Sequence, residues 1–209
     1  DENLKREGVP DSKIRLVGKI MIESVIAHLN NSEDSKVLKQ FDLKAEQFIY
    51  VTLHRPSNVD CRETFGGIVH ELSAIAQQCP VIFPIHPRTR KRLQEFGLSL
   101  EDKPGVKLVE PVGYNASLAL TKNARCVLTD SGGLQEESTF FRTPCLTIRP
   151  NTERPVTISL GSNRLTDITR LRSDFQTVLR GMSRLGTIPP LWDGKTAERI
   201  VQSLLGSTN

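Results

Sequence analysis

The fold is decided by the stretch Cys126-Val127-Leu128-Thr129-Asp130-Ser131-Gly132-Gly133-Leu134-Gln135-Glu136-Glu137. An apolar run ends in a short polar turn, two glycines follow, and the remainder is typical of a helix. A strand, a tight loop and a helix N-terminus form the element with which α/β proteins hold an anion. Glycines lack a Cβ atom, so backbone N–H groups can approach a phosphate, and the helix dipole adds about half a positive charge. The stretch therefore predicts an anion site, with one alternative: a turn in which Ser131 caps the helix and nothing binds.

Composition and charge indicate a soluble globular protein. The chain has 209 residues, enough for one α/β domain with a core, and its net charge is only +4. Because the basic residues are scattered, nucleic acid is not an expected partner, whereas a small anionic ligand is compatible with this charge. No apolar run approaches the roughly 20 residues that span a membrane, so we expect no membrane partner. The charged first residues are typical of the end of a helix and not of a signal peptide.

The four cysteines indicate a reducing compartment. None of them forms a Cys-x-x-Cys pair, and Cys79, Cys126 and Cys145 lie in or beside apolar runs. A reduced cysteine behaves there as a small hydrophobic residue. We therefore expect a cytoplasmic protein with no metal site and no cofactor.

Apolar patterns along the chain predict alternating strands and helices. Short apolar runs predict strands at 14–17, 48–53, 81–85, 106–109, 126–128 and 144–148. Helical patterns cover 20–29, 35–41, 61–78, 88–96, 114–123, 133–141, 175–182 and 196–205, the first of them ended by the polar residues 30–32. The alternation from residue 48 onward predicts an α/β fold with a parallel sheet and helices on both faces.

Polar side chains follow the predicted strands at the points where they end. They are His54 and Arg55, His86, Glu110, Asp130 and Ser131, and Arg149. Ligands of parallel sheets bind at the carboxyl ends of the strands, so these residues are expected to line one site. For His86 an equally good alternative is that it only orders its own loop.

Five stretches, in this order along the chain, resemble the non-hydrolysing UDP-N-acetylglucosamine 2-epimerases. They are Val51-Thr52-Leu53-His54-Arg55-Pro56-Ser57-Asn58, Pro84-Ile85-His86-Pro87-Arg88-Thr89-Arg90, Leu128-Thr129-Asp130-Ser131-Gly132-Gly133-Leu134-Gln135-Glu136-Glu137, Asn151-Thr152-Glu153-Arg154-Pro155-Val156-Thr157 and Trp192-Asp193-Gly194-Lys195. The resemblance covers nearly the whole chain. It implies the C-terminal half of a GT-B fold, in which two Rossmann-like domains enclose the active site.

This resemblance also implies a domain division and partners. Residues 1–30 would be an interdomain connecting segment with a helix, and residues 31–209 the C-terminal Rossmann-like domain that binds UDP. The N-terminal domain is absent from this sequence and would be a partner. The implied partners of the complete enzyme are a UDP-sugar substrate and a second copy, since the family is often homodimeric.

The resemblance assigns roles residue by residue. Ser131, Gly132 and Gly133 would bind the diphosphate, and Glu137 would accept hydrogen bonds from the ribose hydroxyls. Arg154 would pair with a phosphate, and His54 would be the catalytic group that assists the departing UDP. Arg55 and His86 are placed beside them at the UDP site. Three structural alternatives remain: Glu137 as a helix-dipole carboxylate, Arg154 as an ion pair, and His54 as the cap of a strand end.

The implied reaction interconverts UDP-GlcNAc and UDP-ManNAc by elimination of UDP and its addition back to 2-acetamidoglucal. The family's acid and base carboxylates belong to the absent domain, so no residue here is predicted to remove the C2 proton; Glu136 is the nearest and a poor alternative. The segment expected near the uracil offers only Val112 and Ser117. A GT-B glycosyltransferase is the alternative function, and a scaffold domain without activity is a third.

Overall fold

A computed structural model describes residues 2–29 and 34–206 of the chain. Six parallel strands form one sheet in the order β3-β2-β1-β4-β5-β6. The strands are β1 (Ile49–Thr52), β2 (Val81–Pro84), β3 (Val106–Val109), β4 (Cys126–Thr129), β5 (Cys145–Ile148) and β6 (Asn163–Thr166). This is the Rossmann-like order, and it confirms the predicted α/β fold. The order reverses between β1 and β4, where such sheets open a crevice for ligands.

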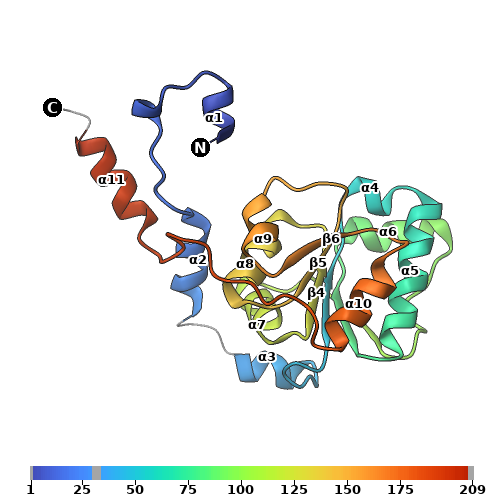
Figure 1. The fold of residues 1–209 in the computed structure, drawn as a ribbon. Helices are drawn as coiled ribbons and strands as arrows, with labels where there is room; N and C mark the ends of the chain where they lie inside the picture. Colours follow the sequence, from blue (N-terminus) through green and yellow to red (C-terminus); the bar gives the residue numbers. More distant parts are fainter. Residues whose placement is uncertain (1, 30–33, 207–209) are drawn as a thin grey trace.

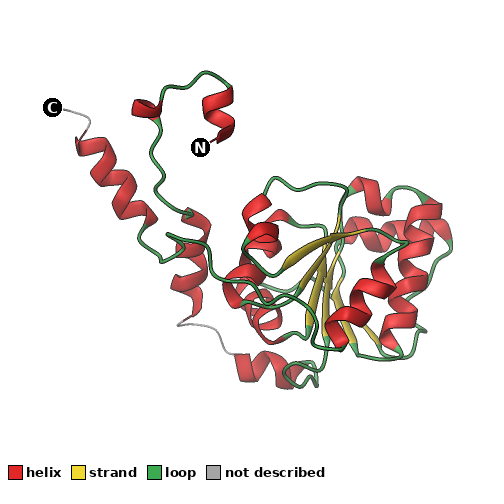
Figure 2. Cartoon of the chain, in the orientation of Figure 1, coloured by secondary structure: helices red, strands yellow, loops and turns green. Residues whose placement is uncertain are grey.

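Helices cover both faces of the sheet (Figures 1 and 2). One face carries α5 (Arg62–Ala76), α6 (Pro87–Phe96) and α10 (Leu171–Leu179). The opposite face carries α3 (Asp34–Gln40), α7 (Tyr114–Asn123), α8 (Gly132–Phe141) and the short α9 (Pro155–Ser159). The short α4 (Pro56–Val59) follows β1 directly.

The two cores follow from the alternation of side chains along buried strands. In β1, Ile49 and Val51 pack with α5, while Tyr50 between them packs with α3 and α7. Because both faces are covered by helices, every residue of β2, β4 and β5 is buried. Burial on both faces therefore explains why these strands appear in the sequence as short, continuously apolar runs.

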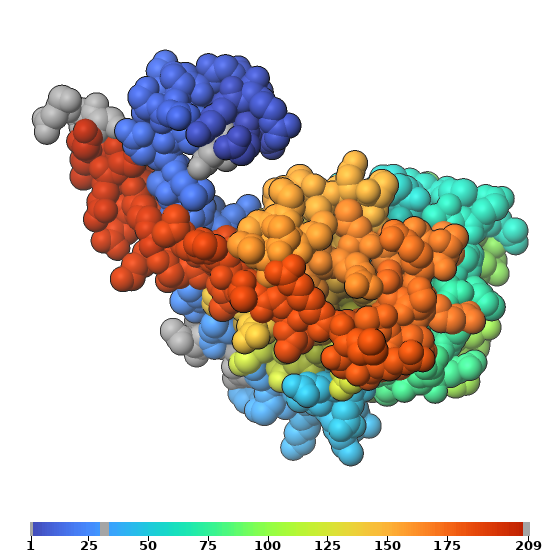
Figure 3. All heavy atoms as spheres, viewed as in Figure 1, coloured from blue at the N-terminus to red at the C-terminus, as the bar shows by residue number. Residues whose placement is uncertain are grey.

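Three further helices lie to one side of the sheet. They are α1 (Glu2–Arg6), α2 (Ile20–Leu29) and α11 (Thr196–Gly206). Helix α2 packs on α7, α8 and α11, whereas α1 and α11 extend away from the body of the molecule (Figure 3). In the described part of the chain, no helix combines the length and the apolar character that a bilayer crossing requires.

The structure corrects several local predictions. Residues 14–17, predicted as a strand, are extended but form no strand in the described structure, because they lie away from the sheet and find no neighbouring strand. Strand β6 was missed, since Asn163 and Arg164 hide its apolar pattern. The last helix of the body ends at Leu179 and not at residue 182, because Gly181 adopts a left-handed conformation with φ 67°. The predicted domain boundary at 30/31, like the helix end at 30–32, lies outside the described residues.

Candidate functional site

The site is organised by Asp130, a fully buried carboxylate at the end of β4. It accepts the backbone N–H groups of His54 (3.0 Å) and Arg55 (2.8 Å) and an N–H of the Asn58 side chain (3.0 Å). Its Oδ1 also lies 3.0 Å from His54 Nδ1. Burial favours the protonated acid, but the hydrogen bonds from His54, Arg55 and Asn58 outweigh it and hold the pKa of Asp130 below its usual range. Asp130 therefore joins the ends of β1 and β4 across the crevice between them.

This contact orients His54. With Nδ1 against Asp130, the free Nε2 edge of the half-exposed ring is available to a ligand. The ring of His86 lies 6.0 Å from that of His54, between centroids. His86 Nδ1 also accepts the backbone N–H of Arg88 (3.2 Å) and so caps α6. Both readings of His86 therefore hold in the structure: it orders its loop and it lies beside His54.

A cavity of about 190 Å³ opens at the carboxyl ends of β1 and β2. It is lined by Tyr50, Thr52, Leu53, His54, Pro84, His86, Pro111, Val112 and Ser117. Val112 and Ser117, the two residues that the sequence offers for a base, thus both lie in it. The Ser117 hydroxyl is held by the Tyr50 hydroxyl at 2.8 Å.

The N-terminus of α8 follows β4 through Asp130 and Ser131. Ser131 occupies the N-cap position, but its side chain makes no capping hydrogen bond. Among the described residues, none accepts a hydrogen bond from the N–H groups of Gly132 or Gly133. The first turn of a helix leaves such groups for a ligand or for water. The strand, loop and helix N-terminus that the sequence predicts are therefore present, and no described residue caps these amides, so anion binding there stays a prediction.

Glu137 lies in the second turn of α8 and is only 9% exposed. Burial raises its pKa to about 7; a hydrogen bond from the Tyr114 hydroxyl offsets part of this rise, and the nearby charge of Glu136 adds to it. The helix-dipole alternative does not account for this position, because that effect fades beyond the first turn, which holds no acidic residue.

Glu136 is paired with two cations. Its Oε1 lies 2.7 Å from Lys19 Nζ and 2.8 Å from Arg154 Nε, and its side chain is 3% exposed. The Nε–H of Arg154 is not aligned with this contact and forms no hydrogen bond in the described structure, so the contact with Glu136 is an ion pair only. Arg154 therefore takes up the ion pair that was its structural alternative, and it can leave Glu136 for a phosphate without breaking a hydrogen bond.

A buried polar network fixes the loop that carries Arg154. The Gln135 side-chain carbonyl accepts from Thr152 Oγ1 (2.6 Å) and from Asn163 Nδ2 (3.1 Å). Thr152 Oγ1 in turn accepts the backbone N–H of Arg154 (2.9 Å). Because Gln135 is fully buried on α8, the network ties the loop to the helix whose N-terminus faces the site.

Two more side chains meet at the same place. Glu153 Oε2 lies 2.7 Å from Arg149 Nη1, and Glu153 Oε1 lies 3.7 Å from Arg55 Nη2. A Cβ atom added to Gly132 would lie 3.1 Å from Glu153 Oε1. Glu153 thus places a carboxylate directly at the first turn of α8.

A family model described as UDP-N-acetylglucosamine 2-epimerase matches residues 1–205. The chain belongs to the UDP-N-acetylglucosamine 2-epimerase family. The UDP-N-acetylglucosamine 2-epimerase of Methanococcus maripaludis is 38% identical, over 98% of this chain and 58% of the relative. A UDP-2,3-diacetamido-2,3-dideoxy-D-glucuronate 2-epimerase of Pseudomonas aeruginosa is 37% identical, over 81% of this chain and 46% of the relative.

Among solved structures, the chain is similar to the UDP-GlcNAc 2-epimerase of Methanocaldococcus jannaschii in complex with UDP-GlcNAc and UDP. The TM-score is 0.86 and the identity 38%, over 98% of this chain and 58% of that chain. The chain thus spans a little over half of the length of these relatives. Within the family, its fold is the C-terminal half of the GT-B architecture.

The structure places His54 beside His86, whereas the other predicted site residues have partners of their own or lie on α8. His54 and His86 line the cavity at the ends of β1 and β2, Arg55 reaches Glu153, and Ser131 to Gly133 form the N-terminal end of α8. Glu137 lies next to Tyr114, whereas Arg154 is directed to Glu136. The roles given to these residues stay predictions.

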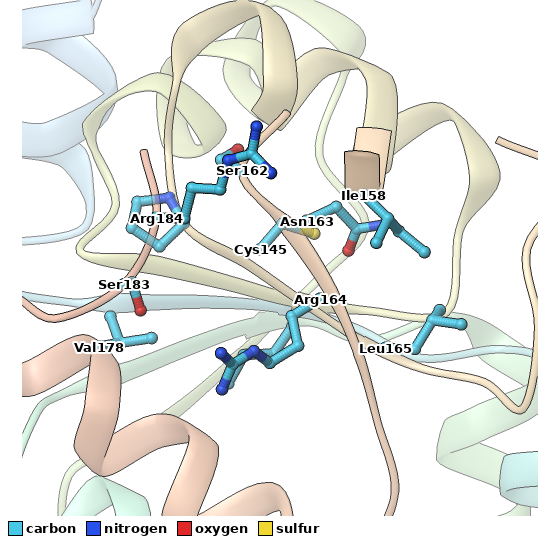
Figure 4. A pocket seen from close by; sticks show the side chains of 11 residues that line it. Cys145, Ile158, Ser162, Asn163, Arg164, Leu165, Val178, Ser183 and Arg184 are labelled. Atoms are coloured by element: carbon cyan, nitrogen blue, oxygen red, sulfur yellow. The ribbon is translucent and has the colours of Figure 1, made fainter. Parts of the chain in front are cut away.

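The sequence analysis expected Asp130 to line the site but gave it no specific role, and it did not single out Gln135, Glu153 or Lys19. Asp130 stands inside the quoted motif, and its position after β4 was the available signal. Lys19 gave none, because its partner Glu136 is distant in sequence. The described residues contain no cluster of acidic, histidine or cysteine side chains suited to a metal. A separate cavity of about 400 Å³ lies beside β6, between Arg164 and Arg184, and includes none of the predicted site residues (Figure 4).

Proposed function

We propose that this chain is the UDP-binding half of a 2-epimerase that interconverts UDP-GlcNAc and UDP-ManNAc. The observation that carries the proposal is the N-terminus of α8, without a side-chain cap and beside the point where the strand order reverses between β1 and β4, in a chain of this family. Backbone amides and a helix dipole suit a diphosphate, and the M. jannaschii relative is named as a complex with UDP-GlcNAc and UDP.

In this proposal Gly132 and Gly133 donate their N–H groups to the diphosphate, with the Ser131 hydroxyl beside them. Glu137 accepts the ribose hydroxyls, and the 190 Å³ cavity lined by Val112 and Ser117 takes the base. Arg154 moves from Glu136 to a phosphate oxygen, and the positive charge of Lys19 stays with Glu136. This supports binding because neither the Glu136 carboxylate nor the Arg154 guanidinium is then left unpaired.

The proposed reaction begins with removal of the C2 proton by a base of the N-terminal domain. The C–H electron pair forms the C1–C2 double bond, and the C1–O bond breaks with its electrons leaving on UDP. His54, oriented by Asp130, lies beside the departing diphosphate and supplies a proton or a positive charge. Addition of UDP back to 2-acetamidoglucal, with a proton delivered to the opposite face of C2, gives the epimer.

Exposed apolar side chains support the proposal of a further domain. Leu4, Leu16, Ile20, Met21 and Val201, all on α2, α11 or the segment before them, are between 44% and 66% exposed. A covering domain would remove this apolar surface from water. The homodimer stays a prediction.

The test is product analysis on a protein that includes the expected N-terminal domain. Incubated with UDP-GlcNAc in D₂O, it is expected to form UDP-ManNAc and to place deuterium at C2 in both epimers. Epimer formation without deuterium at C2 would contradict elimination. Transfer of the sugar to an acceptor, with no epimer, would favour the glycosyltransferase alternative instead.

A further inference from the structure

Glu153 occupies the place at α8 where the proposed function puts a diphosphate. Its Oε1 lies 3.1 Å from the position that a Cβ atom would take on Gly132, so the carboxylate rests against the first turn of the helix. In the described structure, no backbone N–H of that turn donates to it. The carboxylate is therefore near the donors without satisfying them.

Glu153 also pairs with two arginines, Arg149 directly after β5 and Arg55 after β1. Arg149 Nη1 is 2.7 Å from Oε2, and this arginine side chain is only 13% exposed. Arg55 Nη2 is 3.7 Å from Oε1. A negatively charged ligand at α8 would meet both of these cations, but it would also meet the negative charge of Glu153 between them.

The loop does not depend on Glu153 for its conformation. Thr152, fixed by Gln135, holds the backbone of Arg154, and Pro155 begins α9. The Glu153 side chain itself is 45% exposed, and its carboxylate pairs with Arg149 and Arg55 and accepts the backbone N–H of Glu153 itself. It can therefore rotate away while the loop stays in place.

We propose that Glu153 is an internal competitor for the diphosphate, which occupies its site and its two arginines in the unliganded chain and is displaced on binding. This inference rests on the proposed function, since it takes the ligand to be a UDP compound. It follows that removing the charge of Glu153 from the site increases the affinity for UDP.

The test is the affinity of Glu153→Gln for UDP, measured by calorimetry together with uridine as a ligand without phosphate. We expect Kd for UDP to fall by about three- to tenfold, the size of one partly exposed charge pair, and Kd for uridine to stay unchanged. Glu95→Gln is the matched control: Glu95 is 38% exposed and pairs with Arg92 (2.6 Å) and Lys91 (3.6 Å), at the far end of α6. It is expected to bind UDP as the unmodified chain does.

The outcomes separate the two proposals. If the unmodified chain binds UDP and Glu153→Gln binds it equally or more weakly, Glu153 is not a competitor, and weaker binding would make it a direct ligand. If neither protein binds UDP at millimolar concentration, the proposed function fails. Glu153→Ala, with thermal unfolding of each variant, guards against a folding defect, and it is expected to bind UDP at least as tightly as Glu153→Gln.

Discussion

Replacing Glu137 by Gln tests the electrostatics of the site through stability. Burial raises the pKa of Glu137 from 4.5 to about 7. Between these values the folded chain keeps a proton that the unfolded chain releases, so the free energy of unfolding falls as the pH rises through this window. The rise in pKa corresponds to about 3 kcal/mol, which the folded state has lost in full once the pH exceeds about 8.

Glutamine resembles the protonated acid and carries no charge at any pH. The variant and the unmodified chain are therefore expected to be about equally stable at about pH 4, and the variant to be more stable by up to about 3 kcal/mol at about pH 8. The assay is urea unfolding followed by circular dichroism at both pH values. Glu95→Gln is the control, because Glu95 is exposed and its pKa is lowered by the hydrogen bond from Arg92.

The same substitution has the opposite effect on binding. A carboxylate that accepts two ribose hydroxyls must be ionised, so affinity is expected to fall as the pH drops below about 7 and the variant to bind about tenfold more weakly at about pH 8. A UDP-sugar is the better probe, because its diphosphate has no terminal phosphate that titrates in this range. A stability difference between variant and unmodified chain that is the same at both pH values would refute the reasoning.

Three further predictions concern neighbouring residues. Gly132→Ala places a methyl group at the first turn of α8 and is expected to weaken UDP binding by about tenfold. The melting temperature is not expected to fall, since alanine favours a helix. Unchanged affinity in calorimetry would count against binding of the diphosphate by the amides of α8. Asp130→Asn turns a buried acceptor into a partial donor and is expected to lower the free energy of unfolding in urea by about 3 kcal/mol. It is also expected to abolish the fixed orientation of His54, seen as a changed ¹⁵N spectrum of the ring. An unchanged free energy of unfolding would contradict this. Gln135→Leu removes the acceptor for Thr152 and is expected to lower the free energy of unfolding by about 2 kcal/mol and to weaken UDP binding. A loss of stability with unchanged UDP affinity would show that the loop has no part in binding.

The strands and most helices could be predicted because burial on both faces leaves a simple signature. The runs at β1, β2, β4 and β5 are apolar and short, and they bound clear helical patterns such as that of α5. Strand β6 was not predicted, because Asn163 is a buried polar residue that hydrogen-bonds to Gln135 and Thr157 and therefore gives no apolar signal in the sequence. Residues 14–17 have a strand-like pattern but no partner, and pairing is a property of the sheet that no local pattern contains.

Part of the candidate site could likewise be predicted from local motifs, and part depends on the three-dimensional fold. The glycines of α8 and the histidines after β1 and β2 could be found in the sequence, since each belongs to a local motif. The partner of Arg154 could not, because the ion pair to Glu136 depends on how the loop after β5 folds back on α8. The position of the crevice also needed the strand order, which places β1 beside β4 although β2 and β3 separate them in the chain.

The central claim is that the amides at the N-terminus of α8 hold the diphosphate of a nucleotide. The most direct measurement is a titration of the ¹⁵N-labelled chain with UDP, followed by amide NMR. We expect the Gly132 and Gly133 resonances to shift with a common saturating dependence on UDP, and to shift far less with uridine. Saturable binding of UDP that leaves both glycine amides unmoved would contradict it.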